Sequence, residues 1–337
     1  MKKLRTILTI IAVVFLVMSN VTHSPVKALG TDETIYVNAT ADETTVPDGS
    51  ITAPYKTIQA AIDAADEGST IQVAAGTYRE LLDIDKEGLT LKGSNTGVKG
   101  AEGRPAPTTI MFPESITNTL EQSLVTISAD GVTFDGFDII NIVDNPAEHI
   151  GYYPNVYLAM REDVTFINNF VDSNADYVAV GVYGSEGISK EAGLGGILVA
   201  NNTIRSTSGW STLTIYAIGA TVEDNVIIGG LRGLQVQVLN DTVGGVVRNN
   251  TISAYSTPVY HNYANVGSAL WTYENNTLLG EPETNEYRGS GPDTLEWTGF
   301  FIENFGAEHY SAVGMPTTPP SLAFKNNVID GQDILGK

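Results

Sequence analysis

Cysteine is absent from this 337-residue chain, and basic residues are scarce. Without cysteine there is no disulfide framework, so burial of apolar surface has to stabilise the fold, and a chain of this length is long enough for that. The 18 lysine and arginine residues are outnumbered by 39 aspartate and glutamate residues, which leaves a net charge of −21. Such a surface repels phosphate groups, so the composition excludes nucleic acid and anionic lipid as partners.

Long apolar runs are also lacking, with one exception near the N-terminus. The run from Thr6 to Met18 follows Lys2, Lys3 and Arg5, and Val26-Lys27-Ala28 offers small residues for cleavage. This run is too short for a comfortable membrane span and has the layout of a secretory signal peptide. We therefore predict a signal peptide over residues 1–28 and a secreted chain over 29–337, without membrane insertion. An uncleaved anchor is the alternative.

A repeated pair of asparagines is the strongest positive signal. The pair is followed by any residue and then an aliphatic one, at Asn168-Asn169, Asn201-Asn202, Asn249-Asn250, Asn275-Asn276 and Asn326-Asn327, with a looser copy at Asp224-Asn225. The second Asn recurs every 23 to 33 residues, except for a last gap of 51. Short β-rich units at such a period predict a β-solenoid, and the long gap predicts a degenerate coil within it.

Asparagine suits the corner of a stacked coil for two reasons. Equivalent residues of neighbouring coils lie about 4.8 Å apart, so a column of carboxamides can donate and accept hydrogen bonds along the stack. Asparagine also tolerates the left-handed backbone conformation that a sharp corner needs. The sequence therefore predicts an asparagine ladder.

The segment before the first coils carries a different periodicity. Ile58, Ala61, Ile62 and Ala65 recur at helical spacing, which predicts a short amphipathic helix around residues 54–66. A solenoid exposes an apolar cross-section at its end, so we assign this helix as the N-terminal cap. Strands are expected at Thr34–Thr40 and Thr70–Ala74, with a turn through residues 76–80.

The opening of the chain resembles a known family. The segments Tyr55–Ala65, Ile71-Gln72-Val73 and Gly76–Glu80 are similar to the beginning of pectin-lyase-like right-handed parallel β-helix proteins, pectin methylesterases among them. The resemblance implies an all-β fold, with residues 29–337 as a single parallel β-helix domain. Further along, the chain lacks the Gln-Asp-Thr and Phe-Ile-Phe-Gly motifs of pectin methylesterases and the Gly-His-Gly and Arg-Ile-Lys motifs of polygalacturonases.

In that family the Asn corner lies between the second and third strands of a coil, which locates the first strands here. They are expected near Val156–Met160, Tyr177–Tyr183, Leu213–Ile218, Leu234–Val238, Val259–Tyr263 and Phe300–Asn304. Alternation along the strands turns one set of side chains outward. This set is Tyr157, Tyr183, Tyr216, Gln235, Gln237, Tyr260, Asn262, Phe301 and Glu303, with Trp210 and Trp297 just before two of the strands.

An exposed row of aromatic and amide side chains is suited to sugar binding. Aromatic faces stack on sugar rings, and amides form hydrogen bonds with hydroxyl groups. Long loop-like connections precede these strands, so the row is predicted to line a groove. The alternative is that the aromatic side chains pack beneath the long loops.

Few residues on this face could carry catalysis. Polysaccharide lyases of the resembled family use a basic residue to remove a proton next to a uronate carboxylate, with Ca²⁺ or arginine neutralising that carboxylate. This resemblance makes Arg232 a catalytic candidate, although a surface arginine explains the same residue. His261 is the second candidate, as a base at this face, but alternation places it inward unless a bulge intervenes, and a buried core or turn histidine explains it as well. Asp172 and Asp176 could bind Ca²⁺ through carboxylate oxygens, or they are solvated loop acids.

Two functions remain open from the sequence. The first is a secreted, lyase-like enzyme acting on a uronate-containing, pectate-type polysaccharide. The alternative is a non-catalytic extracellular protein that binds glycan or forms a rigid surface solenoid. In either case we expect an extracellular polysaccharide partner and a monomer.

Overall fold

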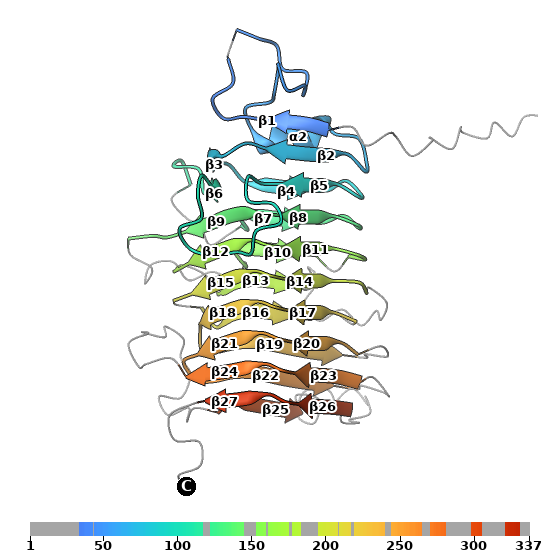
Figure 1. Cartoon of the computed structure of the whole chain (residues 1–337), viewed down its shortest axis with the longest axis vertical. Coiled ribbons are helices and arrows are strands. Elements are labelled where there is room, and N and C mark those ends of the chain that lie inside the picture. Colours follow the sequence, from blue (N-terminus) through green and yellow to red (C-terminus); the bar gives the residue numbers. More distant parts are fainter. Residues whose placement is uncertain are drawn as a thin grey trace, which may run out of the picture. The chain divides into compact units, whose positions relative to one another are not determined.

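The computed structural model describes residues 34–42, 44–116, 122–144, 153–159, 161–174, 177–182, 195–207, 209–216, 219–239, 244–264, 270–280, 298–304 and 321–330. Their strands form three parallel sheets, and the strands of successive coils stack in register (Figure 1). The chain is thus a right-handed parallel β-helix, which confirms the predicted fold class.

From β4 onward, each coil contributes one strand to each sheet in the same order, and β1, β2 and β3 precede the first complete coil. The first-strand sheet contains β4 (Leu82–Ile84), β7 (Val125–Ile127), β10 (Val156–Leu158), β13 (Val178–Val182), β16 (Ser211–Ile215), β19 (Arg232–Leu239), β22 (Thr257–Ala264) and β25 (Phe300–Asn304). The second-strand sheet contains β1 (Thr34–Val37), β2 (Thr70–Val73), β5 (Thr90–Lys92), β8 (Thr133–Asp135), β11 (Thr165–Ile167), β14 (Leu198–Ala200), β17 (Thr221–Glu223), β20 (Val246–Arg248), β23 (Leu270–Glu274) and β26 (Ser321–Lys325). The third-strand sheet contains β3 (Gly76–Arg79), β6 (Thr108–Met111), β9 (Phe137–Asn141), β12 (Phe170–Ser173), β15 (Thr203–Ser206), β18 (Val226–Gly229), β21 (Thr251–Ala254), β24 (Thr277–Gly280) and β27 (Val328–Asp330).

The degenerate coil predicted between Asn276 and Asn327 is not there. Strand β24 pairs directly with β27, and the backbone N–H of Asn276 donates to Oδ1 of Asn327 at 3.0 Å. The spacing of 51 residues therefore belongs to one coil with long insertions between its strands. Sequence spacing misled here because an insertion and an extra coil lengthen the repeat alike.

The asparagine ladder is confirmed from Asn169 to Asn327. In each step, a backbone N–H of one Asn donates to Oδ1 of the next, at 2.8 to 3.0 Å. The residue before each ladder Asn has a positive φ of 54° to 57°, including Asp224 in the looser copy. The two residues of each pair therefore have different roles. The first adopts the left-handed backbone conformation at the corner, and the second forms hydrogen bonds with buried amides.

The core is a set of apolar columns that run along the axis of the coils. Val180, Leu213, Leu234 and Val259 form one such column and are at most 1% exposed. These buried positions alternate with the outward positions expected from the sequence. Their regular alternation also fixes the residues between them, which point away from the core.

A short helix closes the N-terminal end, as predicted. Helix α2 (Ile58–Ala64) buries Ile58, Ala61 and Ile62. Thr57 is its N-cap, and the carboxylate of Glu80 accepts hydrogen bonds from the backbone N–H groups of Ile58 and Gln59 at 2.8 and 2.9 Å. Within the described part of the chain, no helix is both long and apolar enough to cross a bilayer.

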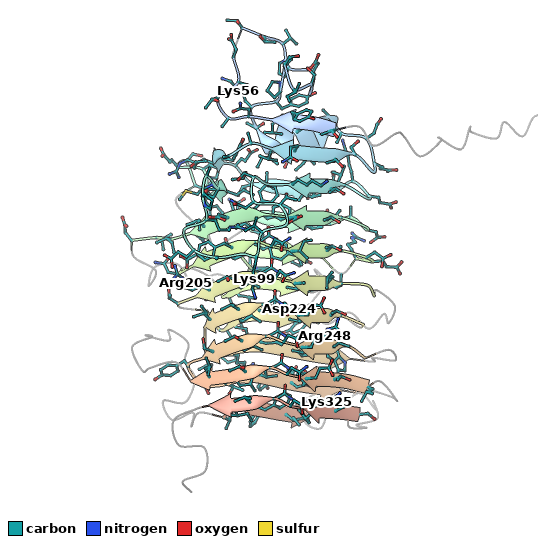
Figure 2. All side chains as sticks on the ribbon, in the orientation of Figure 1. Lys56, Lys99, Arg205, Asp224, Arg248 and Lys325 are labelled. Carbon is teal, nitrogen blue, oxygen red and sulfur yellow. The ribbon has the colours of Figure 1, made fainter. Side chains whose placement is uncertain are left out.

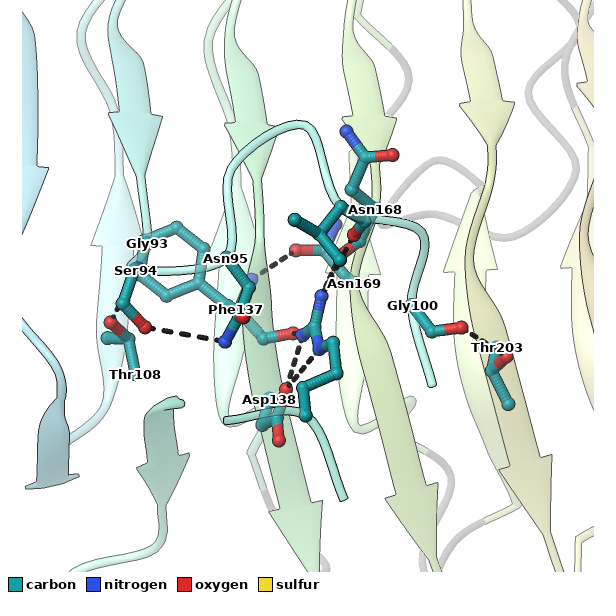
Figure 3. Close-up of polar contacts among 12 residues, drawn as sticks. Gly93, Ser94, Asn95, Gly100, Thr108, Phe137, Asp138, Asn168, Asn169 and Thr203 are labelled. Atoms are coloured by element: carbon teal, nitrogen blue, oxygen red, sulfur yellow. Dashed lines mark hydrogen bonds and ion pairs between the residues drawn. The ribbon is translucent and has the colours of Figure 1, made fainter. Parts of the chain in front are cut away.

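A strap, defined as residues 94–107 between β5 and β6, lies across the Asn corners (Figure 3). Its buried Arg104 forms an ion pair with Asp138 and donates to the carbonyl oxygen of Asn168 at 2.6 Å. Thr203 donates to the carbonyl oxygen of Gly100 at 2.7 Å. A Cβ at Gly100 would lie 1.9 Å from the carbonyl oxygen of Asn169, so only glycine fits there.

Charges alternate along the outer surface of the second-strand sheet. Glu223, Arg248, Glu274 and Lys325 occupy equivalent positions in four successive coils (Arg248 and Lys325 are labelled in Figure 2). Nη2 of Arg248 lies 2.5 Å from Oε2 of Glu223. In-register stacking brings equivalent residues together, so alternating signs avoid the repulsion that a like-charged column would cause.

Candidate functional site

The outward face of the first-strand sheet carries the predicted aromatic and amide side chains in two columns. Thr214, Gln235, Tyr260 and Phe301 are in register along one column. Gln237 and Asn262 share the next outward position. The predicted register is therefore correct, and these residues do lie on one face.

Arg232 lies at the centre of a row of flat side chains that crosses five coils. We call this the aromatic–arginine row, and its members are Tyr177, Trp210, Arg232, Tyr260 and Phe301. The guanidinium carbon of Arg232 lies 4.5 Å from the ring centre of Trp210 and 3.5 Å from that of Tyr260. On the two sides, Tyr177 stacks on Trp210 with centroids 6.1 Å apart, and Tyr260 stacks on Phe301 at 5.6 Å.

Hydrogen bonds hold the polar part of this row in place. Nη1 of Arg232 and Oγ of Ser211 both donate to Oε1 of Gln235, each at 2.9 Å. Nε2 of Gln235 in turn donates to the hydroxyl of Tyr216 at 3.1 Å. Gln235 therefore orients the guanidinium and the phenol together, which leaves neither free to rotate without breaking a bond.

The face is less open than the sequence predicted. The exposed fractions of Gln235, Gln237, Tyr260 and Asn262 are only 3% to 6%, whereas the two ends of the row, Tyr177 and Phe301, are 39% and 42% exposed. Close stacking explains this in part, because Tyr260 lies between the guanidinium of Arg232 and the ring of Phe301. Trp210, Tyr216 and Arg232 are half-buried. Accessible contact is therefore limited to these three side chains and the two ends.

Two buried polar atoms on this face have no hydrogen-bond partner in the described part of the chain. They are the hydroxyl of Thr214 and Oδ1 of Asn262, whose side chains belong to residues 2% and 3% exposed. Leaving such a group unsatisfied costs about 1–3 kcal/mol. An ordered water enclosed beside each atom would remove this cost.

The surroundings of Arg232 favour its charged form. Two aromatic faces flank its guanidinium, and cation–π attraction stabilises the charged form. Its bond to Gln235 also uses an N–H as the donor. A lyase-type base would have to lose that proton, which this environment opposes. The predicted catalytic role of Arg232 therefore finds no support in its surroundings.

His261 lies on the opposite side of the sheet, in the core. It is fully buried in register with Val236 and Ile302, and its Nδ1 lies 2.6 Å from the hydroxyl of Tyr273. Burial lowers the pKa of His261 to about 4. Strand alternation turns it inward, so its predicted role as a base on the outward face is wrong.

Asp172, one of the two predicted calcium ligands, pairs with an arginine. Both carboxylate oxygens of Asp172 accept hydrogen bonds from Arg205, at 2.8 and 2.5 Å, and Arg205 also contacts Glu102 of the strap. The described residues contain no group of three or more acidic or histidine side chains that could hold a metal ion. Asp172 therefore joins two coils and the strap. Asp176 lies outside the described residues.

Three other predicted residues cannot be placed as side chains. Tyr183 and Trp297 lie outside the described residues, and only the backbone of Glu303 is described. Conversely, the sequence analysis missed Tyr177 and Ser211. The outward position of Tyr177 follows from its alternation with the inward Val178, whereas the bond of Ser211 to Gln235 joins neighbouring coils and has no local signal.

Comparison with known proteins places the chain in a family. The family model described as protein of unknown function, DUF1565, matches residues 41–284. The chain belongs to the DUF1565 family. This match includes the N-terminal cap, the strap and four of the five members of the aromatic–arginine row.

This DUF1565 protein is also distantly related to pectin methylesterases. It is 25% identical over 287 residues to a probable pectinesterase A of Neosartorya fischeri, covering 73% of this chain and 88% of the relative. A probable pectinesterase A of Aspergillus niger is 24% identical over 270 residues, with 69% and 82% covered. The crystal structure of the Aspergillus niger pectin methylesterase has a TM-score of 0.45 at 17% identity, covering 91% and 89%.

Proposed function

We propose that this protein is secreted and binds a uronate-rich, pectate-type polysaccharide along the aromatic–arginine row. The observation that carries the proposal is the guanidinium of Arg232, fixed between Trp210 and Tyr260 and bound to Gln235. A planar cation flanked by aromatic rings offers charge for a carboxylate and flat surface for a sugar ring. The distant relation to pectinesterases supports the same class of polymer.

Because the protein is strongly acidic overall, binding of an acidic polysaccharide depends on the positive charge of Arg232. A chain with a net charge of −21 repels a polyuronate at long range, so contact depends on a positive group at the binding face. Arg232 supplies that group. We expect binding to be weak at low salt and to be helped by moderate salt or by Ca²⁺, which screen the repulsion between the two polyanions.

Isothermal titration with oligogalacturonate, and with a neutral galactan of equal length, tests the proposal. Trp210→Ala and Arg232→Gln should each weaken oligogalacturonate binding by about 1–3 kcal/mol, or roughly fivefold to 150-fold. Arg248→Gln is the matched control, because this arginine is on the outer surface of another sheet. Equal affinity of all four proteins would contradict the proposal, as would tighter binding of the galactan.

Eliminative cleavage of the same polymer stays a prediction from the family resemblance. The ultraviolet absorbance of newly formed unsaturated uronates, with and without Ca²⁺, tests it on pectate and alginate. The surroundings of Arg232 and His261 favour binding without cleavage. Growth of that absorbance with wild type, and its loss in Arg232→Gln, would show instead that the face is catalytic.

A further inference from the structure

The C-terminal end of the coils differs from the N-terminal end. At the N-terminal end, a returning segment covers the edge of β1: Tyr36 donates to the carbonyl oxygen of Gly49, and Tyr55 donates to that of Tyr36. The amide side chain of Gln59, on helix α2, likewise bonds to the backbone of Asp83 in β4. Backbone groups that would otherwise attract another strand are satisfied there.

The last coil has no such cover in the described part of the chain. Strands β25, β26 and β27 end the three sheets. Six large apolar side chains of the last two coils are 42% to 55% exposed, namely Leu270, Phe301, Ile302, Phe324, Val328 and Ile329. A cavity of about 320 Å³, lined by Phe300, Phe324 and Ile329 among others, lies at this end. Half of the exposed large apolar side chains that the structure describes thus gather at this one end.

We infer that two copies of this chain meet through their C-terminal ends, with β26 of each copy pairing antiparallel to β26 of the other. A free strand edge recruits another strand. The N-terminal edges of β1 and β4 are already covered, so the surface that matches this edge is the C-terminal end of a second copy. Since each copy has one such end, the assembly stops at two. This replaces the monomer expected from the sequence.

The sequence of β26 suits such pairing. In the register centred on Ala323, Lys325 lies opposite the partner's Ser321, and Leu322 lies opposite the partner's Phe324. Apolar residues therefore meet apolar ones. The two lysines are then about four residues apart along the strand, roughly 14 Å, which exceeds the distance over which charges interact strongly at physiological salt. No like charges of β26 oppose each other.

Two substitutions test the association by sedimentation or light scattering over a range of concentrations. We expect a dimer for wild type, and at least a tenfold increase in the dimer dissociation constant for Phe324→Glu and for Val328→Glu, because each buries an unpaired carboxylate. Val328 is 55% exposed, so Val328→Glu stays informative if Phe324→Glu fails to fold. Val46→Glu, at an exposed site of the N-terminal region, is the matched control and should leave the dimer intact.

The absence of cysteine allows a direct test of the register. Ala323→Cys places the only two thiols of a dimer opposite each other, so a mild oxidant should link them into a disulfide seen on a non-reducing gel. Ser321→Cys, opposite the partner's Lys325, should link much less. A protein that is monomeric at every concentration, that grows beyond a dimer, or that Ala323→Cys fails to link would overturn the inference.

Discussion

At the scale of single residues, asparagine determines more of this fold than any apolar side chain does. Asn250, 1% exposed, illustrates this. Its Oδ1 accepts from the backbone and side chain of Asn225, and its Nδ2 donates to Val222 and Asn276, all at 2.9 or 3.0 Å. One side chain thereby connects three coils, because a carboxamide both donates and accepts.

Removing this residue should be costly. We expect Asn250→Ala to lower the free energy of unfolding by roughly 1–3 kcal/mol, because it leaves buried donors and acceptors of two neighbouring coils unsatisfied. Asn327→Ala, in the last coil and only half-buried, should cost less. Urea unfolding midpoints measure both effects. Equal midpoints for the two variants and wild type would refute the ladder as a source of stability.

His261 should make stability depend on pH. Its pKa is lowered from an ordinary 6.5 to about 4 by burial, so the unfolded chain takes up a proton at higher pH than the folded one. Stability contributed by neutral His261 is therefore complete above pH 6.5 and is lost as the pH falls toward 4. The loss amounts to about 3 kcal/mol at most, from 1.36 kcal/mol per pH unit.

The contribution of His261 to the pH dependence is measured by comparing wild type with His261→Gln. Denaturant unfolding at pH 7 and pH 4.5 should show a smaller loss of stability in His261→Gln than in wild type, since glutamine has no proton to take up. The carboxylates titrate in both proteins and cancel. A loss of equal size in the two proteins would show that His261 does not titrate in this range.

At the scale of elements, helix α2 and the strap act on different parts of the stack of coils. Helix α2 covers the N-terminal end through Ile58 and Ile62, both 0% exposed. The strap joins coils that are far apart in sequence, since Gly100 and Thr203 are separated by 103 residues. Helix α2 thus covers the N-terminal edge of the sheets, and the strap holds neighbouring coils together.

The cap can be tested through its buried side. Replacing Ile58 and Ile62 with Asp should expose the N-terminal end, lower the melting temperature and cause concentration-dependent association seen by light scattering. Ala64→Asp, on the exposed side of the same helix, is the control for added charge and should change neither. A monodisperse double variant with unchanged melting would remove the capping role.

At the scale of the whole molecule, the same repetition that builds the fold also builds the proposed binding face. In-register stacking puts Tyr260 beside Phe301, and the side chain of Arg232, which is in register with Ser211 and Thr257, lies between the rings of Trp210 and Tyr260. Together with Tyr177, which stacks on Trp210, these side chains form one row across five coils. Among the described residues the stacking also leaves an uncovered edge on the last coil, where β25, β26 and β27 end the sheets. The proposed binding face and the proposed association surface therefore both result from the parallel stacking of coils.

The sequence by itself determined the fold class, the Asn corners, the cap and the inward or outward direction of most strand residues. Each of these follows from a period of two in strands, of 3.6 in helix α2, or of about 25 residues between coils, and a local period can be seen in the sequence. The direction of His261 was predictable from alternation for the same reason.

Only the tertiary structure decided which outward side chains remain accessible and which partners they take. Three sets of contacts depend on where another coil or the strap passes. They are those of Arg232 with the rings of Trp210 and Tyr260, of Arg205 with Asp172, and of Arg104 with the carbonyl oxygen of Asn168. Burial of Gln235 and Tyr260 likewise depends on neighbours in the stack. Such contacts join residues that are tens of positions apart, so they leave no periodic pattern in the local sequence.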